Sequence, residues 1–409
     1  MLLETLYDWT SDMVYLKLTA FLSFLAIAFS YFYVPVPDDM PEEDQRAMRK
    51  LYAFQQTGKI VAKVGAVLGV DSTINITRRF RNLMTSSIKQ DSFEVETRFG
   101  QTMDGVSVTI HKKNPWDEKK EGLRPALVYI HGGGWVYEFP ELYALMERYF
   151  AHHLNIIVVS INYRLAPEHP YPAAIEDCTK AIKYLHTHAT EYGVDPGRIS
   201  LAGDSGGGNL AAALALKLRD EGAAFLQRQI LISPATQFAS FRTSSYLANN
   251  RYAVLSRFSC QRYWLLYMNA SLAYVNELEA NEHVSSKVAQ SNAWSFLQKY
   301  QDFPQSKVKV DEKVSKVLEK KLLDPYLCPL MAETMKGLPP TLVLISEYDV
   351  LKDDALAYVD RLKADGVETA VSVTNGYHGI YCSFNGTKSG MQMMMAIFHY
   401  LRPLYAAQK

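Results

Sequence analysis

The hydrophobic pattern divides the first part of the chain into three zones. An uncharged run covers residues 18–34, and a helical pattern, charged at first and then apolar, follows over residues 40–90. Two later segments, Phe93–Arg98 and Val106–His111, alternate in the period of two that is typical of strands. Because Met103-Asp104-Gly105 between them has turn-forming residues, these segments predict a β-hairpin.

Short, continuous apolar runs dominate the rest of the chain. They are rich in β-branched residues, which suits strands that are buried on both faces of a parallel sheet. Five such runs are Ala126–Ile130, Ile156–Ile161, Ile199–Ala202, Ile230–Ile232 and Thr341–Ile345. Helix-length stretches separate most of them, and a strand at Thr369–Val373 and a helix at Met391–Leu404 close the series. Strands that alternate with helices predict an α/β fold with a mostly parallel, eight-stranded sheet flanked by helices.

One long stretch interrupts this alternation, between the strands that begin at Ile230 and Thr341. It is rich in aromatic residues early, and we expect it to form a helical cap over the carboxyl edge of the sheet. The predicted organisation is an anchor helix (1–36), a helical N-terminal part of the cap (37–90), a first part of the core (91–234), the cap insertion (235–324) and a second part of the core (325–409).

The first uncharged run has the features of a membrane anchor. Its sequence, LTAFLSFLAIAFSYFYV, is seventeen residues long, which is at the short end of what spans a bilayer. Tyr31 and Tyr33 stand at one end, where aromatic rings favour the membrane interface. The small residues of a cleavage site are missing before Pro35, which favours an uncleaved anchor over a signal peptide. A buried core helix is the other alternative.

Charge and cysteine content limit the partners. The 43 basic residues equal the 43 acidic ones, and no basic tract is interleaved with aromatic residues, which argues against nucleic acid as a partner. The four cysteines form no C-x-x-C pair, which disfavours a structural zinc site. Two disulfides and four free thiols both remain open.

Three N-glycosylation tripeptides begin at Asn75, Asn269 and Asn385, beyond the anchor. They can be used only if the bulk of the chain faces the lumen of the secretory pathway. The bias of lysine and arginine across the anchor is slight and adds little. The tripeptides therefore favour a lumenal orientation.

The strongest local motif is Gly203-Asp204-Ser205-Gly206-Gly207, a G-x-S-x-G sequence. It follows the strand that ends at Ala202 and opens a helix, which is the context of a nucleophile elbow. In such a turn the small neighbours leave the hydroxyl of Ser205 accessible above the sheet. The alternative is a chance match in a glycine-rich loop, which the strand and the helix make less favourable.

A glycine-rich loop, residues 131–135 (HGGGW), directly follows another strand. Its bare backbone N–H groups predict an oxyanion hole made by Gly132, Gly133 and Gly134 with the N–H of Gly206. His131 belongs to this loop, and we expect it to brace the loop through hydrogen bonds. A phosphate-binding loop would require G-K-[ST], which is absent from this position.

A nucleophilic serine requires a base and an acid that orients the base. Asp349 follows the strand at Thr341–Ile345, and His378 follows the strand at Thr369–Val373, so both are expected at the edge that carries Ser205. The order serine, aspartate, histidine is that of α/β hydrolases. Three other carboxylates compete with Asp349 for this role: Glu347, Asp353 and Asp354.

Together these motifs resemble the hormone-sensitive-lipase branch of the α/β hydrolases, and within it the group of arylacetamide deacetylase and neutral cholesterol ester hydrolase. The matching segments are 131–135 (HGGGW), 163–168 (YRLAPE), 203–209 (GDSGGGN), 324–330 (DPYLCPL), 349–354 (DVLKDD) and 377–379 (YHG). The resemblance implies the α/β-hydrolase fold, a triad of Ser205, Asp349 and His378, and a type II membrane protein of the endoplasmic reticulum with a lumenal catalytic part. Gly206 departs from the group, which usually has alanine there, but only its N–H is needed.

The expected activity is hydrolysis of carboxylic esters with apolar acyl or alcohol groups, such as lipid esters, sterol esters or aryl acetates. It proceeds through an acyl-enzyme and needs no metal or organic cofactor. Cleavage of amides by the same triad is one alternative. A non-catalytic ligand-binding module on the same scaffold is another, because a fold alone does not establish an activity.

Overall fold

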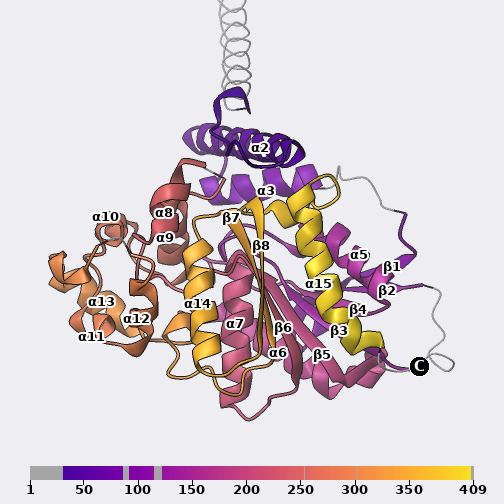
Figure 1. Cartoon of the computed structure of the whole chain (residues 1–409). Helices are drawn as coiled ribbons and strands as arrows, with labels where there is room; N and C mark the ends of the chain where they lie inside the picture. Colours follow the sequence, from indigo (N-terminus) through magenta and orange to yellow (C-terminus); the bar gives the residue numbers. More distant parts are fainter. Residues whose placement is uncertain (1–30, 86–91, 115–121, 253, 302, 407–409) are drawn as a thin grey trace, which may run out of the picture.

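The computed structural model of the chain describes residues 31–85, 92–114, 122–252, 254–301 and 303–406 (Figure 1). The predicted anchor, residues 18–34, lies almost entirely outside these ranges. Within them, none of the helices combines the length and the apolar character that crossing a membrane requires.

An eight-stranded sheet forms the centre of the molecule, in the order β1-β2-β4-β3-β5-β6-β7-β8. Its strands are β1 (Val95–Met103), β2 (Val106–Lys113), β3 (Arg124–Ile130), β4 (Ile157–Ile161), β5 (Val194–Asp204), β6 (Leu226–Ile232), β7 (Thr341–Tyr348) and β8 (Thr369–Tyr377). Strand β2 runs antiparallel to β1 and β4, and every other neighbouring pair is parallel. The predicted mostly parallel, eight-stranded sheet is confirmed.

Helices cover both faces of the sheet, because its central strands have apolar residues on both faces. In β3, Val128 and Ile130 belong to one buried cluster, and Leu127 and Tyr129 belong to the other. Helices α6 (Ala173–Thr187), α7 (Ser205–Asp220) and α14 (Lys352–Ala364) contribute to the first cluster. Helices α5 (Ala144–Leu154) and α15 (Lys388–Ala406) contribute to the second (Figure 1). The continuous apolar runs of the sequence are therefore strands packed on two sides.

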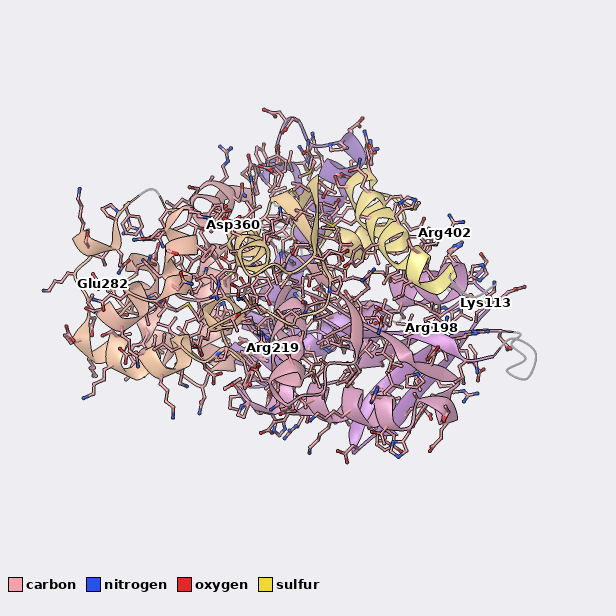
Figure 2. All side chains as sticks on the ribbon, turned by 60° about the horizontal axis from the view of Figure 1, so that its bottom comes forward. Lys113, Arg198, Arg219, Glu282, Asp360 and Arg402 are labelled. Atoms are coloured by element: carbon pink, nitrogen blue, oxygen red, sulfur yellow. The ribbon has the colours of Figure 1, made fainter. Side chains whose placement is uncertain are left out.

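The remaining helices lie outside this three-layered core. Helices α2 (Glu42–Val67) and α3 (Thr73–Thr85) lie across one end of the molecule, with α2 outermost (Figure 1). The insertion between β6 and β7 forms α8 (Ser244–Ala248), α9 (Arg257–Tyr267), α10 (Val275–Ala280), α11 (Ser286–Ala289), α12 (Asn292–Gln298) and α13 (Glu312–Leu322). Glu282 of this insertion and Arg402 of α15 lie at opposite sides of the molecule in Figure 2.

Short 3-10 helices connect several of these elements. They are η1 (Pro140–Leu142), η2 (Ala189–Tyr192), η3 (Asn249–Tyr252), η4 (Leu272–Tyr274), η5 (Gln305–Lys307), η6 (Pro329–Met331) and η7 (Ile380–Ser383). The first and the last of them flank the site described below.

The first described helix is bound to the last one. Asp44 of α2 is fully buried, and its carboxylate accepts hydrogen bonds from the backbone N–H groups of Lys388 (2.7 Å) and Ser389 (3.0 Å). These N–H groups open α15 and have no partner within their own helix. A residue at the start of the chain thus caps the helix at its end.

Candidate active site

Ser205 stands at the turn between β5 and α7. Its φ of 54° is in the left-handed region, where a residue with a side chain is strained. The helix behind it packs so closely on the neighbouring strand that a Cβ at Gly207 would overlap the carbonyl oxygens of Ile130 and His131. The glycine of the motif thus permits the sharp turn, and the turn presents the hydroxyl at the end of the sheet, as a nucleophile elbow requires.

The pairing of β7 with β8 brings the next two functional residues together. Tyr348 pairs with Tyr377, so the residues that follow them, Asp349 and His378, leave the sheet side by side. His378 Nδ1 lies 2.7 Å from Asp349 Oδ2, and His378 Nε2 lies 3.0 Å from Ser205 Oγ. The three side chains predicted from widely separated motifs therefore form one continuous chain of hydrogen bonds.

Asp349 is held in its orientation by its own loop. The residue is buried, and its second carboxylate oxygen accepts the N–H of Leu351 at 2.9 Å. The side-chain amide of Asn249 donates to the backbone carbonyls of Glu347 and Asp349, both at 2.9 Å. Sequence reasoning missed Asn249, because its position in the insertion gives no local signal of this contact.

The three competing carboxylates bind elsewhere. Glu347 pairs with Lys352 at the surface. Asp353 accepts the N–H of Ser245 at 2.6 Å, and Asp354 accepts the amide of Gln237 at 2.6 Å. Only Asp349 among the four carboxylates contacts His378 in the hydrogen bonds of the described chain.

The environment of His378 favours the protonated ring. Burial disfavours the imidazolium, but attraction to the Asp349 carboxylate and the hydrogen bond to it outweigh this effect, so the pKa of His378 is raised above its ordinary value of 6.5. An imidazole that binds a proton readily and lies 3.0 Å from a hydroxyl is suited to act as a general base.

Of the four predicted oxyanion donors, three are available to a substrate in the described chain: two N–H groups of the glycine loop and the N–H of Gly206. Within the described chain, the N–H groups of Gly133, Gly134 and Gly206 donate to no protein acceptor. The N–H of Gly132 instead donates to the hydroxyl of Tyr143 at 3.2 Å. Gly133 and Gly134 line the same cavity as Ser205, so they are better placed than Gly132 to hold an oxyanion.

His131 does not reach the cavity. It is fully buried, stacks on Tyr163 with 4.4 Å between the ring centroids, and places Nδ1 3.0 Å from the carbonyl oxygen of Gly132. Burial lowers the pKa of His131 to about 4, so the ring is neutral near pH 7. Its contacts fit the bracing role expected from the sequence rather than direct contact with an oxyanion.

A cluster of polar groups lies behind this loop. The carboxylate of Asp204, which is fully buried, accepts hydrogen bonds from the hydroxyls of Tyr129 (2.8 Å), Tyr143 (3.2 Å) and Tyr381 (2.6 Å). Burial, followed by the negative charge of Glu138, raises the pKa of Asp204 to about 7. Because Tyr143 also accepts the N–H of Gly132, this cluster fixes the start of the glycine loop.

Ser205 and His378 lie at the wall of a cavity of about 240 Å³. Apart from the residues of the two loops, its walls come mainly from three sources: α2 (Leu51, Phe54, Gly58), α3 (Thr77, Phe80, Arg81) and the insertion (Val254, Leu255, Tyr263). The charge of Arg81 is balanced by Glu138 at 2.7 Å. Most of the wall is apolar, so the cavity suits an apolar group next to the reacting carbonyl.

The aromatic residues of the insertion divide between two tasks. Tyr263 lines the cavity, whereas Trp264 and Tyr267 are buried against Trp135, which ends the glycine loop. The ring centroids lie 4.4 Å and 4.5 Å from that of Trp135. The insertion thus supports the loop as well as covering part of the site, and α10 to α13 extend to the side of the core (Figure 1).

The remaining candidate positions lie away from the cavity. Asn269 and Asn385 are exposed, whereas Asn75 is half-buried on α3 and donates its amide to Asp71 at 2.9 Å. All four cysteines are free thiols: Cys178, Cys260 and Cys328 are buried, and Cys382 is exposed beside the site. This settles the choice that the sequence left open between disulfides and free thiols.

Comparisons with known proteins agree with this fold. A family model described as an α/β-hydrolase fold matches residues 127–293 and 283–382. The chain is 35% identical to arylacetamide deacetylase of Bos taurus over 91% of this chain and 96% of that protein. It is 33% identical to neutral cholesterol ester hydrolase 1 of Bos taurus over 87% of this chain and 90% of that protein.

Solved structures of ester-cleaving enzymes share the fold. An ester hydrolase from the metagenome of Lake Arreo is similar at a TM-score of 0.67 and 25% identity, covering 90% of this chain and 100% of that chain. A hyperthermophilic esterase from the archaeon Pyrobaculum calidifontis is similar at a TM-score of 0.60 and 27% identity, covering 84% of this chain and 97% of that chain.

Proposed function

Because this chain belongs to the α/β-hydrolase family of arylacetamide deacetylase and neutral cholesterol ester hydrolase, and is therefore a carboxylic ester hydrolase, we propose that Ser205 cleaves apolar esters, with His378 as base and Asp349 as orienting acid. The observation that carries this proposal is the hydrogen-bond chain from Asp349 through His378 to Ser205 at a largely apolar cavity. Substrates with lipid, sterol or aryl groups next to the ester fit such walls.

The reaction consists of two acyl transfers. His378 Nε2 takes the proton of Ser205 as Oγ attacks the ester carbonyl, and the N–H groups of Gly133, Gly134 and Gly206 stabilise the negative oxygen. Asp349 accepts a hydrogen bond from Nδ1–H and so holds the tautomer in which Nε2 is free to act as base. His378 then protonates the leaving alcohol, and water, activated by the same ring, releases the acid from Ser205.

Amide cleavage is a second candidate, because a relative at 35% identity is named for deacetylation of an arylacetamide. The same triad serves both reactions, since His378 protonates an amine as it does an alcohol. The rates on an aryl ester and on the matching aryl amide decide which activity dominates.

The proposal also places the enzyme in the endoplasmic reticulum membrane. The uncharged run at residues 18–34 supports a single-pass, type II anchor with the catalytic part in the lumen. Among the three sequons, the exposed Asn269 and Asn385 are the favoured sites of glycosylation, because the amide of Asn75 is half-buried and bonded to Asp71.

Labelling by a fluorophosphonate probe tests the nucleophile and its base together. The probe should modify wild-type Ser205, and the rate should rise with pH with a midpoint above 6.5, because the imidazole must be neutral to accept the serine proton and its pKa is raised. The kcat/KM for a soluble ester should fall as the pH is lowered, with the same midpoint as the labelling rate. A Ser205→Ala chain that is still labelled at the site would overturn the assignment.

Gly133→Ala tests the oxyanion hole. Gly133 has a φ of 91°, and a Cβ there would lie 2.6 Å from the backbone nitrogen of Glu138, so the loop has to move and carry its donors away. We expect kcat to fall about 10²–10³-fold, as for the loss of a single oxyanion donor. Gly206→Ala is the matched comparison: it keeps its N–H, its nearest contacts are at 3.2 Å, and its loss should be much smaller.

Equal losses in the two glycine variants would contradict this placement of the donors. Circular dichroism of both chains separates a local movement of the loop from unfolding of the whole protein.

A further inference from the structure

The end of α2 is apolar on all sides. Residues 60–70 (IVAKVGAVLGV) carry a single charge, that of Lys63. A surface helix of a globular protein normally has one apolar stripe that faces the core and a polar face toward water. A helix that is apolar all round requires a second partner for the face that the core does not cover.

The two faces of α2 meet different surroundings. The inner face contributes Leu51, Phe54 and Gly58 to the wall of the active-site cavity, and Ala62 continues this face as a buried residue. The opposite face and the turn after it form what we call the outer α2 surface: Val61, Val64, Val67, Leu68 and Val70. Val67 is 87% exposed and Leu68 is 73% exposed. In the described part of the chain, no other stretch of ten residues exposes as many large hydrophobic side chains.

The position of this surface indicates a lipid partner. Near the start of the described chain, Phe32 and Tyr33 are both largely exposed, at the end of the uncharged run that we propose as the anchor. In Figure 1 this first segment and α2 lie on the same outer side of the molecule. A membrane that holds the anchor is therefore the nearest apolar phase to α2, and the short tether keeps the two together.

The composition of the outer α2 surface fits the membrane interface rather than the bilayer interior. The segment 60–70 has eleven residues, too few to span the hydrocarbon core, which needs about 20. Lys63 is exposed beside the valines, and a lysine side chain of this kind reaches from an apolar surface to the headgroups. Aromatic residues such as Phe32 and Tyr33 are also favoured at this depth.

We propose that the outer α2 surface rests in the headgroup region of the bilayer, so that the cavity behind α2 receives its apolar esters from the membrane. This inference rests on the membrane anchoring given under the proposed function. Because residues of α2 and α3 line the cavity, docking brings the cavity next to the lipid. A substrate that partitions into the bilayer then enters without crossing water.

The test compares two substrates in the full-length chain. The triple variant Val64→Gln, Val67→Gln, Leu68→Gln keeps good helix formers on α2 and removes its outer apolar face. We expect kcat/KM for a long-chain ester dissolved in phosphatidylcholine vesicles to fall about tenfold or more. The kcat/KM for a water-soluble short ester should stay at the wild-type value, because none of the three residues lines the cavity.

Polar replacement of exposed hydrophobic residues elsewhere serves as the matched control. Val317→Gln on α13 and Leu247→Gln on α8 change side chains that are 45% and 43% exposed and lie outside the outer α2 surface. Both should leave the two activities unchanged. Equal losses on the two substrates in the triple variant would overturn docking and assign the residues to the packing of the cavity wall.

Photo-crosslinking identifies the occupant directly. A photoreactive amino acid at position 67 of the full chain in vesicles should label lipid, whereas the same group at position 317 should not. A cross-linked pair of chains from position 67 would instead make this surface an interface between two copies, and would overturn the proposal.

Failure of the docking proposal is distinguishable from failure of the proposed function. Loss of the soluble-ester activity in Ser205→Ala tests the nucleophile alone, and extraction by alkaline carbonate tests the anchor alone. A chain that is anchored and active, but does not label lipid from position 67, refutes only the docking.

Discussion

Replacing Ser205 by alanine is expected to lower kcat for ester hydrolysis by about 10⁶-fold, because the triad acts as a unit and its removal leaves only the oxyanion donors and substrate binding. The change removes a single oxygen from a residue that is 8% exposed, so the chain should still fold. Initial rates on a soluble aryl ester, read with the protein's near-UV circular dichroism, provide the measurement.

His378→Ala is the companion variant. It removes the base and leaves the hydroxyl, so a loss of similar size is expected, and the double variant should lose no more than either single one. Losses that multiply in the double variant would show that the two residues act independently and would contradict the shared mechanism.

Asp349→Asn is expected to lower kcat by about 10⁴-fold, because an amide does not enforce the tautomer in which Nε2 of His378 accepts the serine proton. In the wild type, His378 Nδ1 lies 2.7 Å from Asp349. With asparagine at this position, the side-chain oxygen can accept a hydrogen bond from Nδ1–H, or the side-chain NH2 can donate one to Nδ1. The acid limb of kcat/KM should also move to lower pH. Without the Asp349 carboxylate, burial, which lowers the pKa of His378, is opposed only by the smaller effects of the charges of Asp204 and Glu138.

Glu347→Gln is the control within the same loop. Glu347 is bonded to Lys352 at the surface and makes no contact with His378, so neither the rate nor the pH profile should change. If Asp349→Asn left the acid limb where it is in the wild type, the carboxylate would not be the group that raises the pKa of the base.

The strands of the core were predictable because their apolar runs are set by burial on both faces, as in Ala126–Ile130, which corresponds to β3 (Arg124–Ile130). Their ends were not. Strand β8 was expected to stop at Val373, but it continues through polar residues to Tyr377. Pairing of Tyr348 with Tyr377 extends it, and such backbone pairing leaves no mark on the hydrophobic pattern.

The triad was predictable because each member follows a strand and the chain order is that of α/β hydrolases. The groups that support it were not. Tyr129, Tyr143 and Tyr381 meet at Asp204 from three separate elements, and a lone tyrosine in a strand or a loop is usually an ordinary core residue. Only the buried carboxylate inside the G-x-S-x-G motif hinted that donors had to be nearby, because an isolated buried charge is unfavourable.

The residues that form the cavity wall could not be predicted from the hydrophobic pattern alone. Within the segment expected to be helical, the structure has helices at Glu42–Val67 and Thr73–Thr85, yet their sequence pattern did not reveal that Phe54 and Phe80 line the cavity of the nucleophile. Which surface two helices cover depends on contacts with segments hundreds of residues away. Such contacts are set by packing in three dimensions rather than by local sequence.

The cap that Asp44 forms on α15 affects when the protein can fold during its synthesis. During synthesis α2 leaves the ribosome early. The two N–H groups that the carboxylate of Asp44 binds belong to residues 388 and 389, which are synthesised near the end. His378 of the triad precedes them closely in the chain. Closing so long a loop is entropically unfavourable until the intervening sheet has formed. A nascent chain that already contains Ser205 therefore cannot yet hydrolyse esters. The activity appears only after the C-terminal residues have been synthesised and have folded.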